Sequence, residues 1–201
     1  MPQSTTALNR ILSWSYARWV TSLGVAVILA GCASTPPPLP LEEQKNYLQT
    51  ADTWTARGRF GAQLPDKYYK GFARLDSTAS GFKLKLSGPL GLGGQTISGL
   101  WRDTQVTTGS GRKKRSIHWH EIGLPLPHPA ALRTWLLGFA PQNSQSVTLD
   151  FMGRNRSFVY QGWQVEYLQY RLTKGIWLPT RIRLKQEQQS TLLVIKHWKL
   201  R

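Results

Sequence analysis

The chain has 201 residues, 40% of them hydrophobic, and its 26 basic and 10 acidic residues give a net charge of +16 at pH 7. This length suits one domain with a sizeable core. A charge of this sign and size attracts nucleic acid, anionic lipid or an acidic protein. The single cysteine excludes an internal disulfide.

Residues 1–31 have the layout of a secretory signal. Two basic residues and no acid occur in residues 1–18, and a short apolar run follows over residues 19–30. The run falls short of the roughly 20 apolar residues that a membrane span requires, although an uncleaved membrane helix remains the alternative. The junction resembles the lipobox of bacterial lipoproteins, whose cysteine is lipidated and becomes the new N-terminus: Leu29-Ala30-Gly31-Cys32.

Lipidation at Cys32 has consequences for location and charge. Position 33 is Ala rather than Asp, and by resemblance to the sorting rule of many Gram-negative lipoproteins this favours the periplasmic face of the outer membrane. Removal of Arg10 and Arg18 with the signal leaves a mature net charge of +14. Export makes nucleic acid the least expected of the three partner classes, so we predict no nucleic-acid binding.

Two short segments follow the cysteine. Residues 33–40 are proline-rich, which predicts an extended, semi-rigid tether. Residues 41–52 predict a short helix, with two glutamates in the first turn, where the helix dipole favours acids. We therefore expect a signal over 1–31, an anchor and tether over 32–40, and a single domain over 41–201.

From Trp54 onward the dominant period is two, which predicts strands with apolar side chains on one sheet face and charged ones on the other. The clearest alternation lies at 82–86, 163–167 and 181–185. Further strands are predicted at 55–64, 68–76, 94–102, 104–108, 146–152, 156–161 and 191–198. Many short strands predict one large antiparallel sheet, curled toward a barrel or folded as a sandwich.

Two segments depart from this period. Within residues 123–141 we predict a short apolar helix that begins at Pro129 and ends near Gly138, and that either caps the open end of a barrel or seals the core. Residues 109–115 hold the basic cluster Arg112-Lys113-Lys114-Arg115 between small residues, which predicts an exposed loop. Such a cluster either is merely solvated or binds an anionic surface.

Catalytic signatures are scarce. His118 and His120 would face the same way in a strand and could meet a metal, yet no third ligand is evident, so two surface or cap histidines are the favoured interpretation. The chain has no nucleophile elbow, H-E-x-x-H string or P-loop. We therefore predict no enzyme, metal site or cofactor. Nine tryptophans favour a wide, apolar cavity for an apolar ligand.

Several segments, each weak alone, together resemble the outer-membrane lipoprotein receptor LolB family. Besides the lipobox they comprise residues 54–60, 84–91, 123–127, 132–138, 162–167, 178–182 and 196–198, in family order over nearly the whole mature chain. The chain departs from the family pattern in its charged segment at 109–115 and in its long pre-lipobox segment. These departures leave local surface details open.

The resemblance implies an open, half-closed antiparallel β-barrel with short helices as a lid over a hydrophobic cavity. It implies a monomeric receptor that accepts acylated lipoproteins from the periplasmic carrier LolA and inserts them into outer-membrane lipid without a cofactor. A lipid- or glycolipid-binding lipoprotein of the same fold, an anchored hydrolase and an envelope scaffold are the alternatives. A large apolar cavity, or its absence, would separate these classes.

The resemblance and the alternation also name site residues. We expect the inward-facing side chains to line the acyl cavity: Phe82, Leu84, Leu86, Trp135, Leu136, Trp163, Val165, Tyr167, Ile182 and Leu184. In the family a leucine at the Leu90 position projects from the domain, so Pro89, Leu90 and Gly91 are expected to form a membrane-insertion loop. The alternative is a glycine-rich hairpin whose leucines fold back into the core.

Overall fold

The computed structural model describes residues 37–89, 94–110 and 113–201, so Cys32, Leu90 and Gly91 lie outside the described residues. One antiparallel sheet of eleven strands dominates it, in the order β6-β5-β4-β3-β2-β1-β11-β10-β9-β8-β7. The strands are β1 (Trp54–Gln63), β2 (Tyr68–Ser77), β3 (Gly81–Ser87), β4 (Gln95–Leu100), β5 (Gln105–Ser110), β6 (Lys113–His118), β7 (Gln145–Leu149), β8 (Asn155–Tyr160), β9 (Trp163–Thr173), β10 (Ile176–Gln186) and β11 (Gln189–Leu200).

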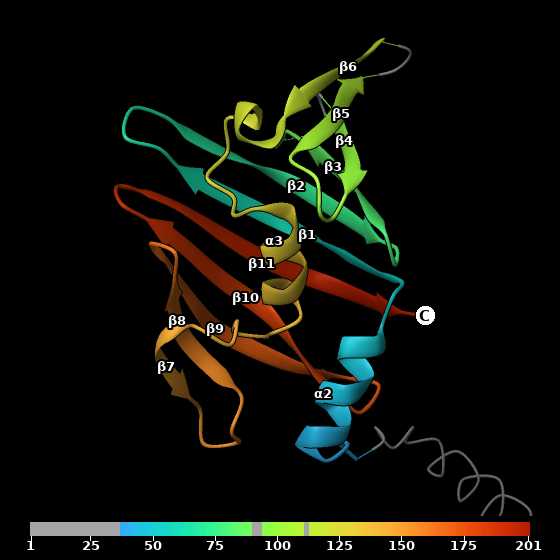
Figure 1. Ribbon diagram of the computed structural model, residues 1–201, viewed down its shortest axis with the longest axis vertical. Helices are drawn as coiled ribbons and strands as arrows, with labels where there is room; N and C mark the ends of the chain where they lie inside the picture. The colour runs from blue at the N-terminus through green and yellow to red at the C-terminus, as the bar shows by residue number, and fades with distance from the viewer. Residues whose placement is uncertain (1–36, 90–93, 111–112) are drawn as a thin grey trace, which may run out of the picture. The chain divides into compact units, whose positions relative to one another are not determined.

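The sheet is strongly curved but open. Its edges are β6 and β7, and its middle is formed by β1 paired with β11. Figure 1 shows the sheet curling around a helix that lies within its concave side. The prediction of a mainly β, half-closed antiparallel barrel is confirmed.

A bulge between Arg57 and Gly58 breaks the central β1–β11 pairing. A Cβ atom at Gly58 would collide with the carbonyl oxygen of Val194, so only glycine permits this close approach of the two backbones. Bulges increase the local twist, and this one lies in the central strand pair of the sheet that curves around the helix in Figure 1.

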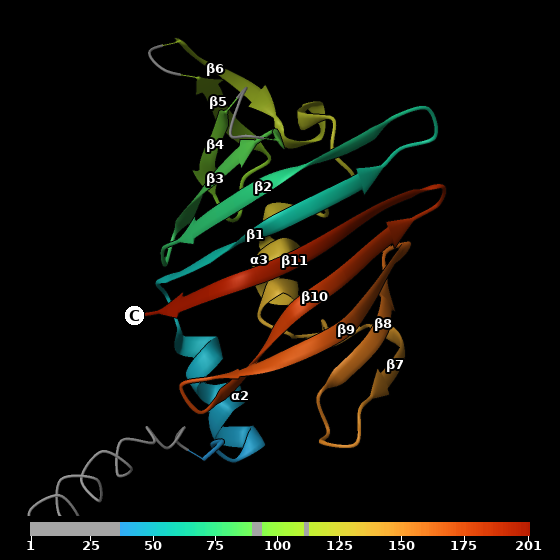
Figure 2. The ribbon, with the colours of Figure 1, turned by 180° about the vertical axis from the view of Figure 1, so that it is seen from behind.

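Within the described residues, two α-helices accompany the sheet. Helix α2 (Leu41–Thr50) matches the predicted segment and lies at one end of the long axis of the domain (Figure 1). Helix α3 (Pro129–Leu136) begins at the predicted proline, and His128 caps it by accepting a hydrogen bond from the amide of Ala130 (3.2 Å). The views from opposite sides place α3 on the concave face, with the sheet behind it in Figure 1 and in front of it in Figure 2. Among the described residues no helix is both long and apolar enough to cross a membrane.

The prediction of a loop over residues 109–115 is wrong. Residues up to Ser110 belong to β5, and the three basic residues from Lys113 to Arg115 open strand β6. The strand forms because Ile117 pairs with Val106 and both are buried, which anchors the rest of β6 in register. The basic side chains stay exposed on an edge strand, where lysines discourage further strand pairing.

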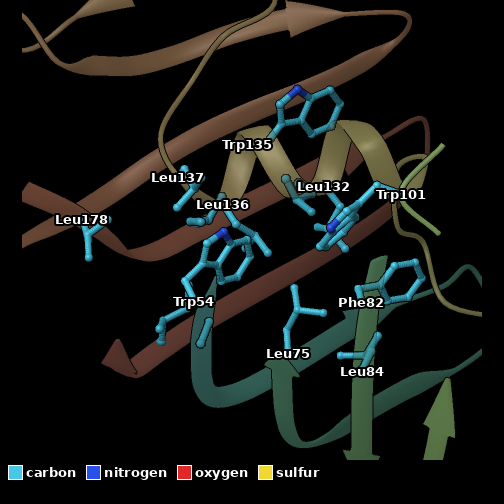
Figure 3. Close-up of a cluster of buried hydrophobic side chains, with 14 of the residues drawn as sticks. Trp54, Leu75, Phe82, Leu84, Trp101, Leu132, Trp135, Leu136, Leu137 and Leu178 are labelled. Carbon is cyan, nitrogen blue, oxygen red and sulfur yellow. The ribbon is translucent and has the colours of Figure 1, made fainter. Parts of the chain in front are cut away.

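Alternation divides the sheet into two faces. The inner face packs toward α3 and carries the core, whereas the outer face points away from it. Figure 3 shows leucines of α3 reaching toward Leu75, Leu84 and Trp54 of the inner face. Leu84 is 5% exposed while its neighbour Lys83 is exposed, so the predicted assignment of faces is confirmed for β3.

Candidate functional site

A small apolar cavity of about 60 Å³ lies between the inner face and residues 123–138, which we call the lid segment. The segment comprises the proline-rich stretch and α3. The cavity is lined by Ala56, Arg57, Gly58, Arg59, Phe60, Ala73, Leu75, Leu84, Leu86, Leu124, Leu126, Leu132, Leu136, Thr191, Leu193, Val194 and Ile195. Its walls therefore come from β1, β2, β3, β11 and the lid segment.

The chemistry of the walls is that of a hydrocarbon site. Most of the lining is aliphatic, and the buried polar side chain among it is Thr191, whose hydroxyl is already occupied. Among the described residues no other buried polar side chain lines this cavity. An apolar chain is the ligand class that such walls accept.

The cavity is too small for a long acyl chain in this conformation. A cavity needs about 10–15 Å³ to hold one water, so 60 Å³ is room for only a few waters. Binding a chain of a dozen or more carbons requires the lid segment to move away from the sheet.

Side-chain hydrogen bonds to backbone carbonyls hold the lid segment in place. Thr191 Oγ1 donates to the carbonyl oxygen of Pro125 (2.7 Å), and Trp119 Nε1 donates to that of Pro127 (2.9 Å). At the α3 end, Tyr167 Oη donates to the carbonyl oxygen of Trp135 (2.8 Å). Burial raises the pKa of the Tyr167 hydroxyl well above its usual value, so it remains a donor at physiological pH. These separate bonds can break without unpairing any strand.

Three of the ten predicted lining residues, Leu84, Leu86 and Leu136, are brought together at this cavity. Val165, Ile182 and Leu184 are buried on the inner face of β9 and β10, away from it. The aromatic residues among the ten pack elsewhere in the core. As residues that an acyl chain would contact, the ten remain a proposal.

The tryptophans form packed clusters instead of cavity walls. Phe82 lies 4.8 Å from Trp101 and 5.6 Å from Trp119 between ring centroids. A second cluster joins Trp135 to Phe158 (5.5 Å) and to the half-buried Trp163 (6.3 Å). None of the tryptophans within the described ranges lines the 60 Å³ cavity, so packing in the core explains their abundance better than a role as cavity walls.

Sequence reasoning missed most of the wall that the lid segment and β11 provide. Leu124 and Leu126 flank a proline in a stretch with no regular period, and Leu193 and Ile195 lie in a nearly continuous apolar run. A continuous apolar run does not tell which side chains face inward. For Leu132 the helical spacing on the α3 face was the available signal.

The histidine pair serves a local structural purpose. His118 ends β6 and His120 lies in the short 3-10 helix η2 (Trp119–Ile122), with their rings stacked at 5.6 Å. Glu121 accepts a hydrogen bond from the His118 amide (2.9 Å) as part of a capping box. Over the described ranges, histidine, cysteine and acidic residues form no group of three that could hold a metal ion.

The expected insertion loop joins β3 to β4. Pro89 is exposed at its start and Gly94 at its end, whereas Leu90 and Gly91 lie outside the described residues. A membrane-contact role for this loop remains a prediction.

Comparisons with known proteins agree with the open β-sheet and the apolar site described above. The family model described as "Outer membrane lipoprotein LolB" matches residues 52–198. The outer-membrane lipoprotein LolB of Pseudomonas savastanoi is 30% identical over 92% of this chain and 98% of its own length, and that of Stutzerimonas stutzeri is 31% identical over 88% and 93%. A crystal structure of a LolA-superfamily protein from Nitrosomonas europaea covers 79% of this chain and 91% of its own with a TM-score of 0.52 at 12% identity, which supports the fold alone. The chain belongs to the LolB family of outer-membrane lipoproteins.

Proposed function

We propose that this protein is the outer-membrane receptor that accepts acylated lipoproteins from the periplasmic carrier LolA and releases them into the outer membrane. Membership of the LolB family supports handling of lipoprotein cargo. The structural observation that carries the proposal is the aliphatic cavity beneath a lid segment held by a few polar contacts. The family is one of lipoprotein-binding proteins, so the chain is not an enzyme.

The reaction is a physical transfer. An acyl chain exposed to water costs about 0.8 kcal/mol for each CH₂ group, so it must pass between enclosed apolar sites. Displacing the lid segment exposes aliphatic side chains of four strands, which can then bury the chain. Transfer from the carrier requires only a higher acyl affinity here, and release requires a still better site in the bilayer.

The N-terminal segments are proposed to place the protein at the membrane. Residues 1–31 are proposed to be a signal that is removed, and residues 32–40 an anchor and tether that hold the single domain of residues 41–201 at the membrane. Lipid on Cys32 keeps the receptor beside its target bilayer. The loop with Pro89, Leu90 and Gly91 is proposed to contact that bilayer during release.

Filling the cavity tests the proposal. Ala73 lines the cavity, so Ala73→Phe should occupy the space into which the acyl chain enters, while the exposed Ala79→Phe is the matched control. We expect transfer of an acylated lipoprotein from purified LolA to fall strongly with Ala73→Phe and to stay unchanged with the control. Thermal unfolding of both variants identifies any loss due to overpacking, which typically costs 1–3 kcal/mol. Unchanged transfer by a folded Ala73→Phe protein would show that the cargo binds elsewhere.

A further inference from the structure

The tether leaves the domain at a fixed point. The amide of Leu39 donates to the carbonyl oxygen of Gly175 in the β9–β10 turn (2.9 Å), and the amide of Trp177 donates to Oε1 of Gln44 on α2 (2.8 Å). Gln44 is 4% exposed. The chain therefore enters the domain beside the β9–β10 turn.

The β3–β4 turn lies toward the opposite rim. β3 ends at Ser87, whose partner Phe72 pairs in turn with Arg59. Arg59 also pairs with Val194, the partner of Arg181, and Gly175 precedes Arg181 by six residues, so it lies near the level of the beginning of β1. Four strand spacings of about 4.8 Å and roughly six residues of about 3.3 Å separate the two points. The distance between them is thus on the order of 25–30 Å.

This separation restricts how the anchored domain can meet a membrane. The seven peptide units from Cys32 to Leu39 span at most about 25 Å, and about 22 Å as polyproline II. If the β3–β4 turn pointed straight at the bilayer, the separation of about 20 Å along the strands would take up almost the whole length of the tether. With the strands parallel to the membrane, both the anchor and the turn reach it with slack.

The outer face carries the charge that such a pose needs. Arg57, Arg59, Lys85 and Lys196 line one hollow of about 390 Å³ on this face, which is the near side in Figure 2. Over the described ranges none of the four has a carboxylate oxygen within 4.0 Å. Phe72 lies in the same hollow, 43% exposed, with the Arg59 guanidinium 5.4 Å from its ring centroid.

Acids on the outer face do not cancel this charge. Asp76 is bound by Arg74 (2.8 Å) and Glu166 by Arg183 (2.8 Å), so each acid is already paired with a cation. The four cations around Phe72 are left in excess, and basic residues close to an anionic bilayer surface are attracted to it.

We propose that the outer face of β1, β2, β3 and β11 lies against the anionic phospholipid headgroups of the membrane, with Arg57, Arg59, Lys85 and Lys196 as the contacts and Phe72 at the level of the interface. The inference rests on the proposed function, because it takes Cys32 as the anchor and the β3–β4 turn as the insertion loop. It goes beyond that function by fixing the orientation of the receptor.

Vesicle co-sedimentation tests the surface without cargo. The compact unit Pro37–Arg201 contains the whole described core, so a chain of residues 32–201 with Cys32→Ala retains the fold, which circular dichroism verifies. Vesicles of phosphatidylethanolamine with phosphatidylglycerol are compared with vesicles in which phosphatidylcholine replaces the anionic lipid. We compare Lys85→Gln/Lys196→Gln with the matched hairpin variant Lys113→Gln/Lys114→Gln, and with the rescue variant Lys85→Arg/Lys196→Arg.

Each basic residue near the surface is worth about fivefold in affinity, so the Lys85/Lys196 glutamine variant should bind anionic vesicles about 25-fold more weakly. The arginine variant and the hairpin variant should bind like the parent. Equal losses in both glutamine variants, a loss in the hairpin variant alone, or no preference for anionic vesicles overturns the proposal. If Lys85→Gln/Lys196→Gln slows LolA-dependent transfer but leaves vesicle binding unchanged, the surface is a protein docking site, and this outcome also overturns the proposal. Failure of transfer with intact vesicle binding contradicts the receptor function instead.

Discussion

The hydroxyl of Thr191 on β11 donates a 2.7 Å hydrogen bond to the carbonyl oxygen of Pro125, and this buried contact fastens the lid segment to the floor of the cavity. Thr191 is 1% exposed and also lines the cavity. The contact that closes the cavity therefore lies within the cavity itself, where an entering chain would meet it.

Removing this hydroxyl should loosen the lid. Thr191→Val leaves the Pro125 carbonyl without its partner, which typically costs about 1–3 kcal/mol of stability. Because the cost falls on the closed lid, uptake of a fluorescent fatty acid should become faster. Stopped-flow fluorescence and urea unfolding measure the two effects.

Thr180→Val is the matched control, since Thr180 is also buried but donates to the carbonyl oxygen of Gln169 on the neighbouring strand (3.3 Å). It should lower stability without changing the uptake rate. Equal acceleration in both variants would show that general loosening, and not release of the lid, governs entry.

Trp119 lies just before the lid segment and Trp135 lies within it on α3, and the two differ in how their indole groups are satisfied. Trp119 Nε1 donates to the Pro127 carbonyl, whereas Trp135 Nε1 is buried without a partner. We expect Trp119→Phe to destabilise the protein by about 1 kcal/mol more than Trp135→Phe, because only the former breaks a hydrogen bond. Thermal unfolding of both variants gives the difference. A larger loss for Trp135→Phe would mean that its N–H has a partner in solution.

A third prediction concerns Arg154, which joins the β7–β8 turn to β9 and β10. Its guanidinium lies between the rings of Tyr170 (4.7 Å) and Trp177 (4.5 Å) and pairs with Asp150 (2.6 Å). Burial alone would raise the pKa of Asp150, but hydrogen bonds from Arg154 and from the amides of Arg154 and Met152 outweigh it and hold this pKa below its usual value.

A lowered folded-state pKa gives stability that is present above the unfolded value of about 3.9 and is lost as pH falls through the folded value. Asp150→Asn should therefore destabilise the protein at pH 7, by about 3 kcal/mol for a largely buried pair, and the difference from wild type should shrink below about pH 4. Urea unfolding across pH 3–7 measures this convergence. Asp66→Asn, at an exposed pair with Lys67, is the control and should change stability little at pH 7. A gap between Asp150→Asn and wild type that stays constant from pH 7 to pH 3 would contradict the assignment.

The alternation predicted the faces of the sheet because each side chain of β3 meets either the core or solvent. It could not identify the cavity, because the walls come from strands and a lid segment that meet only in the tertiary structure. The basic residues 113–115 led to the wrong prediction of a loop. They belong to a strand because the burial of Ile117 against Val106 outweighs the charge of the basic side chains. The abundance of aromatic residues likewise shows only that many bulky side chains are present. Their packing in the tertiary structure decides whether they line a cavity or fill the core.

An aspartate introduced on the inner face of β3 should affect folding and acyl binding very differently from one introduced on the outer face. Leu84→Asp places a carboxylate on the inner face, where burial without a partner costs several kcal/mol, so the protein should unfold or lose acyl binding. Lys83→Asp changes an exposed outer position and should be mild. Trp163→Asp, at a half-buried inner position, should resemble Leu84→Asp. Equal tolerance of all three in thermal unfolding and acyl-probe binding would contradict the assigned faces.

The last prediction separates uptake from release at Leu90. A change in an exposed loop usually alters stability by no more than about 0.5 kcal/mol. If Leu90 is the exposed insertion residue that we propose, Leu90→Glu should fold and should accept cargo from LolA. A charge at the point of bilayer contact opposes entry, at a cost of up to roughly 3 kcal/mol at the hydrocarbon centre, so transfer from the receptor to liposomes should fail. Leu90→Phe should retain both steps, because an apolar group of similar reach can enter the interface. Unfolding of Leu90→Glu would place the leucine in the core, and normal release would move the insertion step to Leu92 or to the β5–β6 hairpin.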